Sequence, residues 1–325
     1  MTVPKAIVVS ENGGPEVLIA AEVDISGPGA GSLLVRVAAA GVNYIDTYQR
    51  TGAYPVPLPF TPGLEGSGTV EAVGDGVTDF AVGDRVAWTH SIGSYAEQVV
   101  IPATWAVPVP DEVDDETAAA VLLQGLTAHY LSASTYPVQE GDTVLVHAAA
   151  GGVGLLLVQL AKARGARVIG TVSTPDKERL ARDAGADEVI RYDEQDFVAR
   201  TKELTGGEGV AAVYDGVGAT TFDGSLQVLR RRGVLALFGA ASGPVPPVDP
   251  QRLNAAGSVF LARPTLSDHL ATPEETRWRV GELFGAITGG DLRVSVTGRY
   301  PLVDARRSHE ELEGRLTTGK LLLIP

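Results

Sequence analysis

The chain has 325 residues, of which 44% are hydrophobic and 20% charged, as expected for about two globular domains and not for a disordered or disulfide-stapled fold. It contains no cysteine, which excludes disulfides, thiolate nucleophiles and cysteine-ligated zinc. The net charge of −14 disfavours phosphate backbones and anionic lipid surfaces as partners, so nucleic-acid binding is not expected.

The first ten residues hold a single lysine and lack the long apolar stretch of a secretion signal, so a cytoplasmic location is expected. Up to about residue 120, short β-like segments alternate with glycine and proline, for example at 33–39, 68–73 and 84–88. This pattern predicts a β-rich domain.

From Gly141 onward, strand and helix signals alternate, which predicts a parallel sheet built from βαβ units. The predicted strands are 143–147, 167–171, 189–191, 210–214 and 234–238, and the predicted helices are 152–164, 175–184, 195–204 and 221–229. The apolar window 144–161 is long enough for a membrane span, but Gly151, Gly152 and Gly154 break it into a buried strand, a turn and a helix.

After Pro264 the alternation stops. Helices are predicted at 273–288 and 303–316, and strands at 292–300 and 320–324. This C-terminal segment is too short to form a stable hydrophobic core of its own, so it is expected to return to the first domain.

The first predicted strand of the alternating region leads into Ala149-Ala150-Gly151-Gly152-Val153-Gly154, an A-x-G-x-x-G form of the dinucleotide fingerprint. Its position after a strand and at the start of a helix makes the motif credible. Gly151 would let the backbone approach a pyrophosphate, and Gly154 would let helix and strand pack closely. A turn required only for packing is the alternative.

About twenty residues further on, an NAD-binding protein presents an acid to the ribose. This chain instead has Gly170-Thr171-Val172-Ser173, with Lys177 one helical turn later. The Ser173 hydroxyl and the Lys177 cation, with no carboxylate beside them, favour the 2′-phosphate of NADPH. The alternative is that Lys177 is a solvated helix residue without a role in binding.

Several motifs occur in order along nearly the whole chain: Gly13–Leu18, Gly41–Asp46, Val82–Val86, Gln124–Thr127, His147–Gly154, Val213–Gly218, Phe238-Gly239 and Leu321–Pro325. With them the chain resembles the zinc-independent quinone oxidoreductases, the ζ-crystallin-like branch of the medium-chain dehydrogenase/reductases. The resemblance implies an α/β fold with a Rossmann domain, a doubly wound parallel sheet, at residues 121–263. It also implies a GroES-like β-rich catalytic domain formed from both chain ends, residues 1–120 and 264–325.

In such proteins nicotinamide and substrate meet in the cleft between the domains. The resemblance also implies that an outer strand near 259–262 pairs across a homodimer, which would satisfy the free edge of the sheet. Zinc-dependent relatives carry a cysteine where this chain has Asn43 and a histidine shortly before the glutamate represented here by Glu65. Both ligands are missing and the histidines show no metal-ligand spacing, so no metal is expected. Among the histidines, only His129 is considered for a pocket role.

The resemblance further implies the cofactor contacts, residue by residue. Residues near the pyrophosphate would be Gly151, Gly152 and Val153, and those around the 2′-phosphate Ser173, Lys177, Tyr192 and Arg315. Residues near the nicotinamide, its ribose and the diphosphate would be Asn43, Thr127, Phe238, Gly239 and Arg263.

The acceptor pocket is expected to be lined by Asn43, Tyr48 and Tyr54, whose tyrosine hydroxyls can donate to a developing oxyanion. Simple packing of these aromatics is the alternative. Quinone reduction needs little beyond a well-positioned hydride donor. No buried acid can be named from the sequence, and solvent can protonate the product.

The function expected from these observations is NADPH-dependent, metal-free reduction of a quinone. One alternative is reduction of the C=C bond of an α,β-unsaturated carbonyl. The other is a non-catalytic NADPH-binding or structural protein.

Overall fold

The computed structural model describes residues 3–325, which divide into two compact units. The first unit contains the chain up to Leu123 together with Thr276–Gly290 and Val294–Pro325. The second unit contains Gln124–Glu275 and the short segment Asp291–Arg293. The first unit is therefore assembled from both ends of the chain.

The second unit contains a six-stranded sheet in which every neighbouring pair of strands is parallel. Its strands are β8 (Thr143–Val146), β9 (Arg167–Val172), β10 (Glu188–Arg191), β11 (Val210–Asp215), β12 (Leu229–Leu237) and β13 (Phe260–Ala262). Their order, β10-β9-β8-β11-β12-β13, is that of a doubly wound nucleotide-binding sheet. The predicted Rossmann domain is confirmed.

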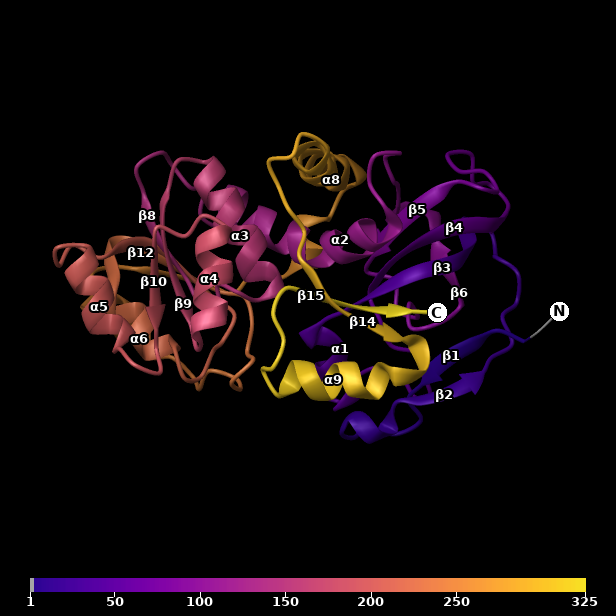
Figure 1. Ribbon diagram of the computed structural model, residues 1–325, viewed down its shortest axis with the longest axis horizontal. Coiled ribbons are helices and arrows are strands. Elements are labelled where there is room, and N and C mark those ends of the chain that lie inside the picture. The colour runs from indigo at the N-terminus through magenta and orange to yellow at the C-terminus, as the bar shows by residue number, and fades with distance from the viewer. Residues whose placement is uncertain (1–2) are drawn as a thin grey trace. The chain divides into compact units, whose positions relative to one another are not determined.

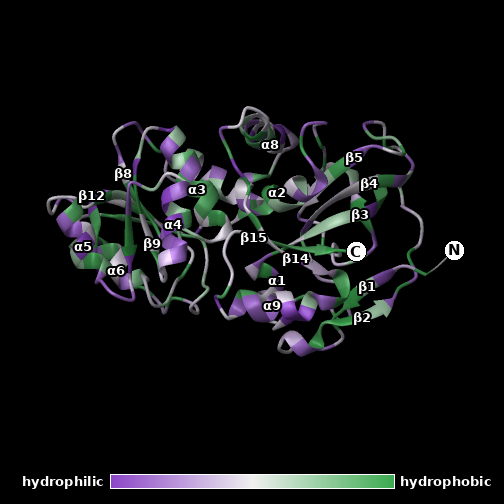
Figure 2. Cartoon of the chain, viewed as in Figure 1, coloured by the Kyte–Doolittle hydropathy of each residue, from purple (hydrophilic) through white to green (hydrophobic). Residues whose placement is uncertain are grey.

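Helices connect these strands: α3 (Gly152–Ala163), α4 (Pro175–Asp183), α5 (Phe197–Leu204), α6 (Phe222–Gln227) and the short α7 (Gln251–Ala255). In Figure 1, α3 and α4 lie together on one side of the sheet, and α5 and α6 on the other. The strands are apolar and the helices carry polar outer faces, as Figure 2 shows for β8 and α4. This division follows from burying the sheet on both faces.

Local signals in the sequence account for the helix ends. The Thr174 side chain accepts the Lys177 N–H at the start of α4, and the Asp196 carboxylate accepts two N–H groups at the start of α5. Gly165 and Gly185 follow α3 and α4 with φ of 80° and 104°, which a residue with a side chain rarely adopts.

The first unit is built mainly of antiparallel strands. They are β1 (Lys5–Val8), β2 (Ile19–Glu22), β3 (Ser32–Val42), β4 (Glu65–Val73), β5 (Arg85–Thr89), β6 (Gln98–Pro102), β7 (Ala106–Pro108), β14 (Val296–Pro301) and β15 (Lys320–Ile324). The larger sheet has the order β14-β15-β3-β4-β5-β7, with β6 also paired to β3. Because β15 pairs antiparallel with β3, with Leu322 opposite Gly41, the last strand of the chain completes the first domain as predicted.

Four α-helices accompany the first unit or join it to the second in sequence: α1 (Tyr44–Arg50), α2 (Asp115–Tyr130), α8 (Pro273–Thr288) and α9 (Ala305–Glu313). The β-rich first 120 residues also contain α1 and the start of α2, for which no helix was predicted. Helix α1 has only seven residues and lies between glycine- and proline-rich segments, so its periodic signal is too short to detect. The predicted strand at 292–300 begins only at Val296, and the helix predicted at 303–316 is shorter.

Within residues 3–325 no helix has the length and apolar character needed to cross a bilayer. The apolar window at 144–161 consists of β8, the glycine turn and α3, as its glycines predict.

Candidate active site

The candidate cofactor residues of the second unit gather at one edge of its sheet. Strand β8 is followed by Gly151–Val153, β9 by Ser173, β10 by Tyr192, β12 by Phe238 and β13 by Arg263. Because all these strands are parallel, their carboxyl ends lie at the same edge, where nucleotides bind in such sheets. The structure therefore brings together residues from five separate segments.

The glycine turn has little room for side chains. A Cβ on Gly154 would lie 2.3 Å from the Ala148 carbonyl oxygen, and a Cβ on Gly170 would lie 2.8 Å from Ala149 Cβ. Gly151 is the N-cap of α3, so the first N–H groups of that helix follow it directly. A glycine turn at a helix N-terminus fits a pyrophosphate.

A buried chain of hydrogen bonds lies next to this turn, at the ends of the neighbouring strands. The Ser225 hydroxyl donates to Asp215 over 2.9 Å and therefore accepts from His147 Nε2, 3.0 Å away. His147 Nδ1 is thus the acceptor for the Thr171 hydroxyl at 2.9 Å. Burial lowers the pKa of His147, which agrees with a neutral ring. The chain ties the ends of β8, β9 and β11 together next to the turn.

The end of β9 carries the residues assigned to the 2′-phosphate. The Tyr192 N–H donates to the Val172 carbonyl over 3.1 Å, so Tyr192 and Ser173 lie side by side. Lys177 is half-buried in the first turn of α4. No carboxylate follows β9 directly, so a 2′-phosphate would meet no acid from Val172, Ser173 or Thr174.

Helix α2 adds one residue that sequence reasoning did not assign to the site. A Cβ on Gly152 would lie 1.9 Å from Gln124 Oε1, so the Gln124 side chain covers the start of α3. Thr127 lies one helical turn further along α2 and is 8% exposed. Gln124 belongs to the motif Gln124–Thr127, and that motif was the available signal for it.

At the other end of the sheet edge, Phe238 and Gly239 rest against the turn after β11. Their N–H groups donate to the Asp215 carbonyl over 2.9 and 3.4 Å. A Cβ on Gly239 would lie 2.5 Å from the Gly216 carbonyl oxygen, so this turn also permits no side chain. Arg263 and Tyr192 are exposed.

In the first unit, Asn43 is only 3% exposed, and its amide is held by neighbouring groups. Its Nδ2 donates to Glu65 Oε1 at 2.8 Å and to the Gly41 carbonyl at 3.4 Å. Its Oδ1 accepts from Lys320 Nζ at 2.8 Å. Lys320 also forms an ion pair with Glu65, and both side chains are fully buried. Sequence reasoning missed Glu65 and Lys320 as partners of Asn43.

The candidate pocket tyrosines lie on and just after α1. The rings of Tyr48 and Tyr54 are 5.3 Å apart, and the Tyr54 N–H donates to the Tyr48 carbonyl. Tyr54 is 43% exposed, so its hydroxyl can reach a ligand. Tyr44 on the same helix donates to the Leu312 carbonyl at 3.0 Å, and burial raises its pKa. Arg315, which is exposed, interacts electrostatically with Tyr44.

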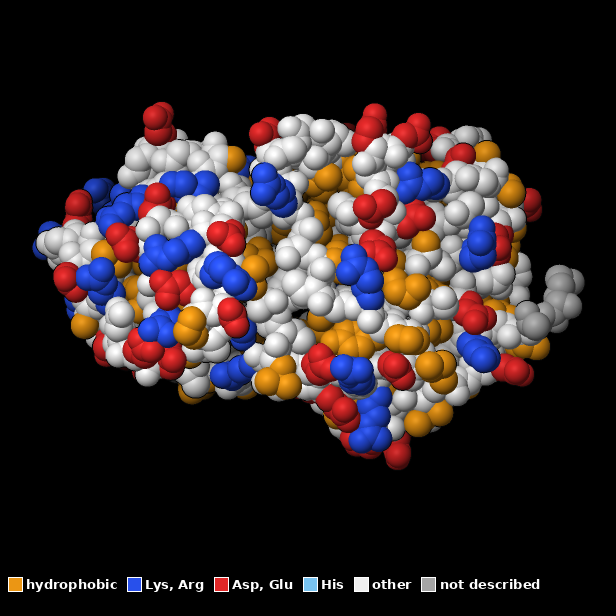
Figure 3. All heavy atoms as spheres, viewed as in Figure 1, with side chains coloured by type: hydrophobic (Ala, Val, Ile, Leu, Met, Phe, Trp, Pro, Cys, Tyr) orange, Lys and Arg blue, Asp and Glu red, His pale blue; other side chains and the backbone are white. Residues whose placement is uncertain are grey.

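A metal is not supported by the donors that are present. Among residues 3–325, no group of three or more His, Cys, Asp and Glu side chains is arranged to hold a metal ion. His129 is buried within α2, and His309 bonds to Arg50 and Tyr95. Acidic and basic side chains are intermixed on the face drawn in Figure 3, and that face has no continuous basic groove for a nucleic acid.

Comparison with known proteins agrees with this two-part architecture. A family model described as "Alcohol dehydrogenase GroES-like domain" matches residues 29–111, and one described as "Zinc-binding dehydrogenase" matches residues 152–271. A quinone oxidoreductase of Pseudomonas aeruginosa is 48% identical, with 99% of each chain covered. A 2-haloacrylate reductase of a Burkholderia species is 41% identical, with 98% of each chain covered.

Among solved structures, a mycobacterial protein complexed with NADPH superposes with a TM-score of 0.96. It is 58% identical, and the match covers 99% of this chain and 100% of the other. A GroES-like domain joined to a Rossmann domain defines a medium-chain dehydrogenase/reductase. Within that superfamily the chain belongs to the zinc-independent quinone oxidoreductases.

Proposed function

We propose that the protein is an NADPH-dependent oxidoreductase that reduces quinones without a metal. The observation that carries the proposal is the sheet edge of the second unit, where a glycine turn leads into α3 and no acid stands among the first three residues after β9. NADPH, when bound, supplies the hydride. Gly151–Val153 would hold its pyrophosphate, and Ser173, Lys177 and Tyr192 its 2′-phosphate.

The residues of α1 would serve the acceptor. Tyr48 and Tyr54 lie close together, and the exposed Tyr54 hydroxyl can donate to an oxygen that gains negative charge. Asn43 has its amide committed to Glu65 and Lys320, so its contribution is to fix the start of α1. Thr127, Phe238, Gly239, Arg263 and Arg315 complete the proposed cofactor contacts.

The test of function is NADPH oxidation by the purified protein with matched panels of quinones and enones, and with NADH as the paired reductant. Turnover of quinones with a preference for NADPH would support the proposal. Tight NADPH binding without turnover of either panel would contradict it and favour a non-catalytic NADPH-binding role.

Reduction of the C=C bond of an α,β-unsaturated carbonyl is the second candidate. The 41% identity to a 2-haloacrylate reductase over nearly the whole chain favours it specifically. The same hydride donor and oxyanion donors would serve this chemistry, because an enolate oxygen also gains charge. Turnover confined to the enone panel would replace the substrate class and keep the cofactor assignment.

Replacing Lys177 with glutamate should raise the KM for NADPH by roughly ten- to a hundredfold, because a carboxylate would replace a cation beside the phosphate. The KM for NADH should change little, since NADH has no 2′-phosphate. The measurement is steady-state kinetics with both cofactors. Lys202→Glu, at an exposed position on α5 away from the β9 end, is the control for an added carboxylate on a helix. Equal losses for both cofactors would contradict the assignment of Lys177.

We also propose a homodimer that pairs through β13. The support is that β13 ends the order of the sheet and that Phe260 on it is 59% exposed. Phe260→Lys should convert the dimer to a monomer in light scattering. Val303→Lys, at a position 57% exposed in the first unit, should leave the assembly unchanged. A monomeric wild-type protein would end this proposal.

Two further proposals concern location and domain limits. A cytoplasmic location is supported by the use of a reduced nicotinamide, and cell fractionation tests it. The proposed functional domains are residues 1–120 with 264–325, and residues 121–263. The order of the motifs supports these limits, although residues 264–275 group with the second compact unit.

A further inference from the structure

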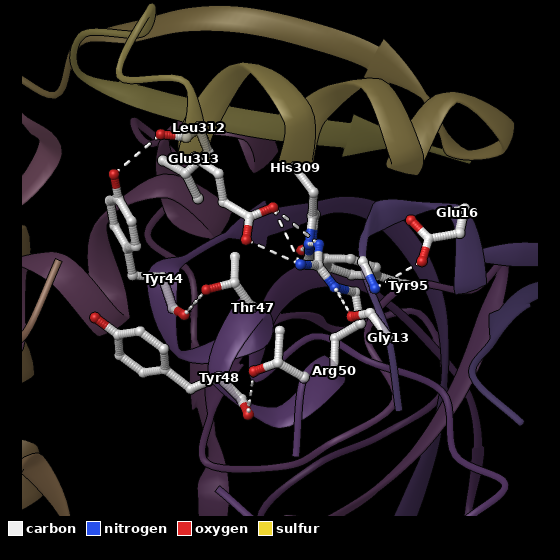
Figure 4. A network of polar contacts seen from close by, with 12 residues as sticks. Gly13, Glu16, Tyr44, Thr47, Tyr48, Arg50, Tyr95, His309, Leu312 and Glu313 are labelled. Atoms are coloured by element: carbon white, nitrogen blue, oxygen red, sulfur yellow. Dashed lines mark hydrogen bonds and ion pairs between the residues drawn. The ribbon is translucent and has the colours of Figure 1, made fainter. Parts of the chain in front are cut away.

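A chain of polar side chains, buried except at Glu313, links α9 to α1 in the first unit. It starts at Glu313, whose carboxylate binds both terminal nitrogens of Arg50 over 2.9–3.1 Å. Arg50 also donates to His309 Nδ1 at 3.0 Å. Figure 4 shows Arg50, at the end of α1, beside Glu313 and His309 of α9, with Tyr44 and Tyr48 nearer the start of α1.

The chain continues from His309 through Tyr95 to Asp46. His309 Nε2 lies 3.0 Å from the Tyr95 hydroxyl, which donates to Asp46 Oδ2 at 2.9 Å. The same Oδ2 accepts the main-chain N–H of Asn43 at 2.8 Å. Arg50, Tyr95, His309 and Asp46 are each at most 1% exposed. The chain therefore ends at the main-chain N–H of Asn43, the N-cap residue of α1.

The direction of every hydrogen bond in this chain follows from Arg50. A guanidinium has no acceptor atom, so His309 Nδ1 must be the acceptor and carries no proton. The proton of the neutral ring is then on Nε2, which donates to the Tyr95 oxygen and leaves the Tyr95 proton for Asp46. Burial, with the charge of Arg50, lowers the pKa of His309 to about 3, in agreement with a neutral ring.

From Arg50 onward, through His309 and Tyr95, the hydrogen bonds thus donate in sequence toward the Asp46 carboxylate. Asp46 Oδ2 receives two donors, whereas Oδ1 is buried without a hydrogen-bond partner. A proton taken up by Asp46 would bind at Oδ1, and it would remove the negative charge that strengthens both hydrogen bonds at Oδ2.

We propose that Asp46 is a positioning residue for the acceptor site, whose negative charge holds Asn43 and the start of α1 in the arrangement that binds the acceptor. This inference rests on the proposed function in that α1 carries Tyr48. Asp46 acts through the Asn43 N–H and through the chain to α9, and it does not itself touch the acceptor.

The surroundings of Asp46 set the pH at which this charge is lost. Burial raises its pKa to about 7, although the hydrogen bonds from Asn43 and Tyr95 and the charge of Lys320 oppose the rise. The charge of Glu65 on β4 adds to it. The other titratable or charged groups of the chain lie beyond Tyr95: His309 on α9, then Arg50 on α1 and Glu313 on α9.

The ionised form is the one that holds Asn43, so kcat/KM for the acceptor should fall as the pH drops through about 7. It should reach a plateau roughly five- to tenfold lower, since the neutral carboxyl still accepts hydrogen bonds, more weakly. Asp46→Asn should give that low value at every pH from about 5 to about 9, without the fall in kcat/KM at low pH, here called the acid limb. A mere structural role would lower activity but leave a wild-type limb in place.

Two tyrosine variants keep the test decisive if Asp46→Asn folds poorly. Tyr95→Phe removes a hydrogen bond that lowers the pKa of Asp46, so the limb should move to higher pH. Tyr300→Phe removes a comparable bond, from the Tyr300 hydroxyl to Glu311 at 2.5 Å, outside the chain. It should leave the limb where it is. A limb unmoved in Tyr95→Phe would overturn the proposal.

The NMR resonance of the main-chain amide proton of Asn43 provides a readout that needs no turnover. Its proton shift should step near pH 7 in the wild type and should not step in Asp46→Asn, because the amide donates to that carboxylate. If neither quinones nor enones turn over but the step is present, the proposed function fails and the link between Asp46 and Asn43 stands. If quinones turn over with a flat wild-type profile and no step is seen, the positioning role is overturned and the function stands.

Discussion

Replacing Lys320 with methionine should lower the free energy of unfolding of the first unit by about 3–5 kcal/mol. Lys320 and Glu65 form an ion pair in which the side chains are 1% and 0% exposed. Methionine fills much of the space of the lysine stem but leaves the Glu65 carboxylate buried without its cation. It also leaves Asn43 Oδ1 without the ammonium that donates to it over 2.8 Å.

The measurement is urea unfolding followed by tryptophan fluorescence. The three tryptophans of the chain, Trp88, Trp105 and Trp278, all belong to the first unit, so the signal reports this unit separately. That separation is needed because two-domain proteins seldom unfold in one step.

Two variants give the control and the counter-test. Arg299→Met breaks the ion pair with Glu116 in the same unit, where the side chains are 53% and 38% exposed, and it should cost far less because water screens this pair. Adding Glu65→Gln to Lys320→Met should restore part of the loss, because the unpaired charge is removed. A loss in Lys320→Met no larger than in Arg299→Met would contradict the role of this pair.

Most of the second unit could be predicted from the sequence. Its elements from β8 to α6 follow local patterns of apolar residues bounded by glycine or by a capping residue, such as Thr174 at α4. Strand β12 begins at Leu229, earlier than the strand predicted at 234–238, and the short α7 was not predicted. The parallel order then follows from the βαβ connections, and the sheet edge follows from the order. The glycine turn was predictable because its function depends on the local backbone.

The first unit was less predictable, because its important contacts join residues far apart in the chain. Lys320 and Asn43 are 277 positions apart, and His309 and Arg50 are 259 apart. No local period predicts that a lysine in a terminal strand is fully buried, or that Glu65 lies opposite it. The sequence did contain one signal for Asp46: Asn43 and Asp46 have the N-cap and N3 spacing of a capping box.

The two chains of hydrogen bonds have the same arrangement, in which each donor points to the next group and the last one to a carboxylate. This arrangement could not be predicted from the sequence. In the second unit, Thr171, His147 and Ser225 all donate in sequence toward Asp215. In the first unit, Arg50, His309 and Tyr95 donate toward Asp46. Each chain contains a neutral histidine and ends on a carboxylate. The chain in the second unit lies next to the glycine turn before α3, and the chain in the first unit lies next to the start of α1, both segments assigned to the site. The assigned segments are therefore held by directed polar contacts in addition to apolar packing.

Replacing Gly154 with alanine should destabilise the second unit by roughly 3 kcal/mol and lower kcat/KM for NADPH about a hundredfold. The new Cβ would lie 2.3 Å from the Ala148 carbonyl oxygen and 2.8 Å from Ala149 Cα. Both atoms are backbone, so the turn itself must move, and with it the N–H groups proposed to hold the pyrophosphate. Hydrogen exchange of amides in α3 and β8 would measure the loss of stability.

Gly152→Ala is the matched control, because its Cβ meets a side chain instead. The close atom is Gln124 Oε1 at 1.9 Å, at the far end of a flexible side chain that can rotate away. Its cost in stability should therefore stay below about 1 kcal/mol, although the added methyl group lies beside the proposed pyrophosphate site. Equal stability losses in the two variants would show that Gln124 is as rigid as the backbone, and normal stability of Gly154→Ala would show that the turn can move freely. Only a large difference between these two neighbouring glycines agrees with a turn whose shape is set by its own backbone.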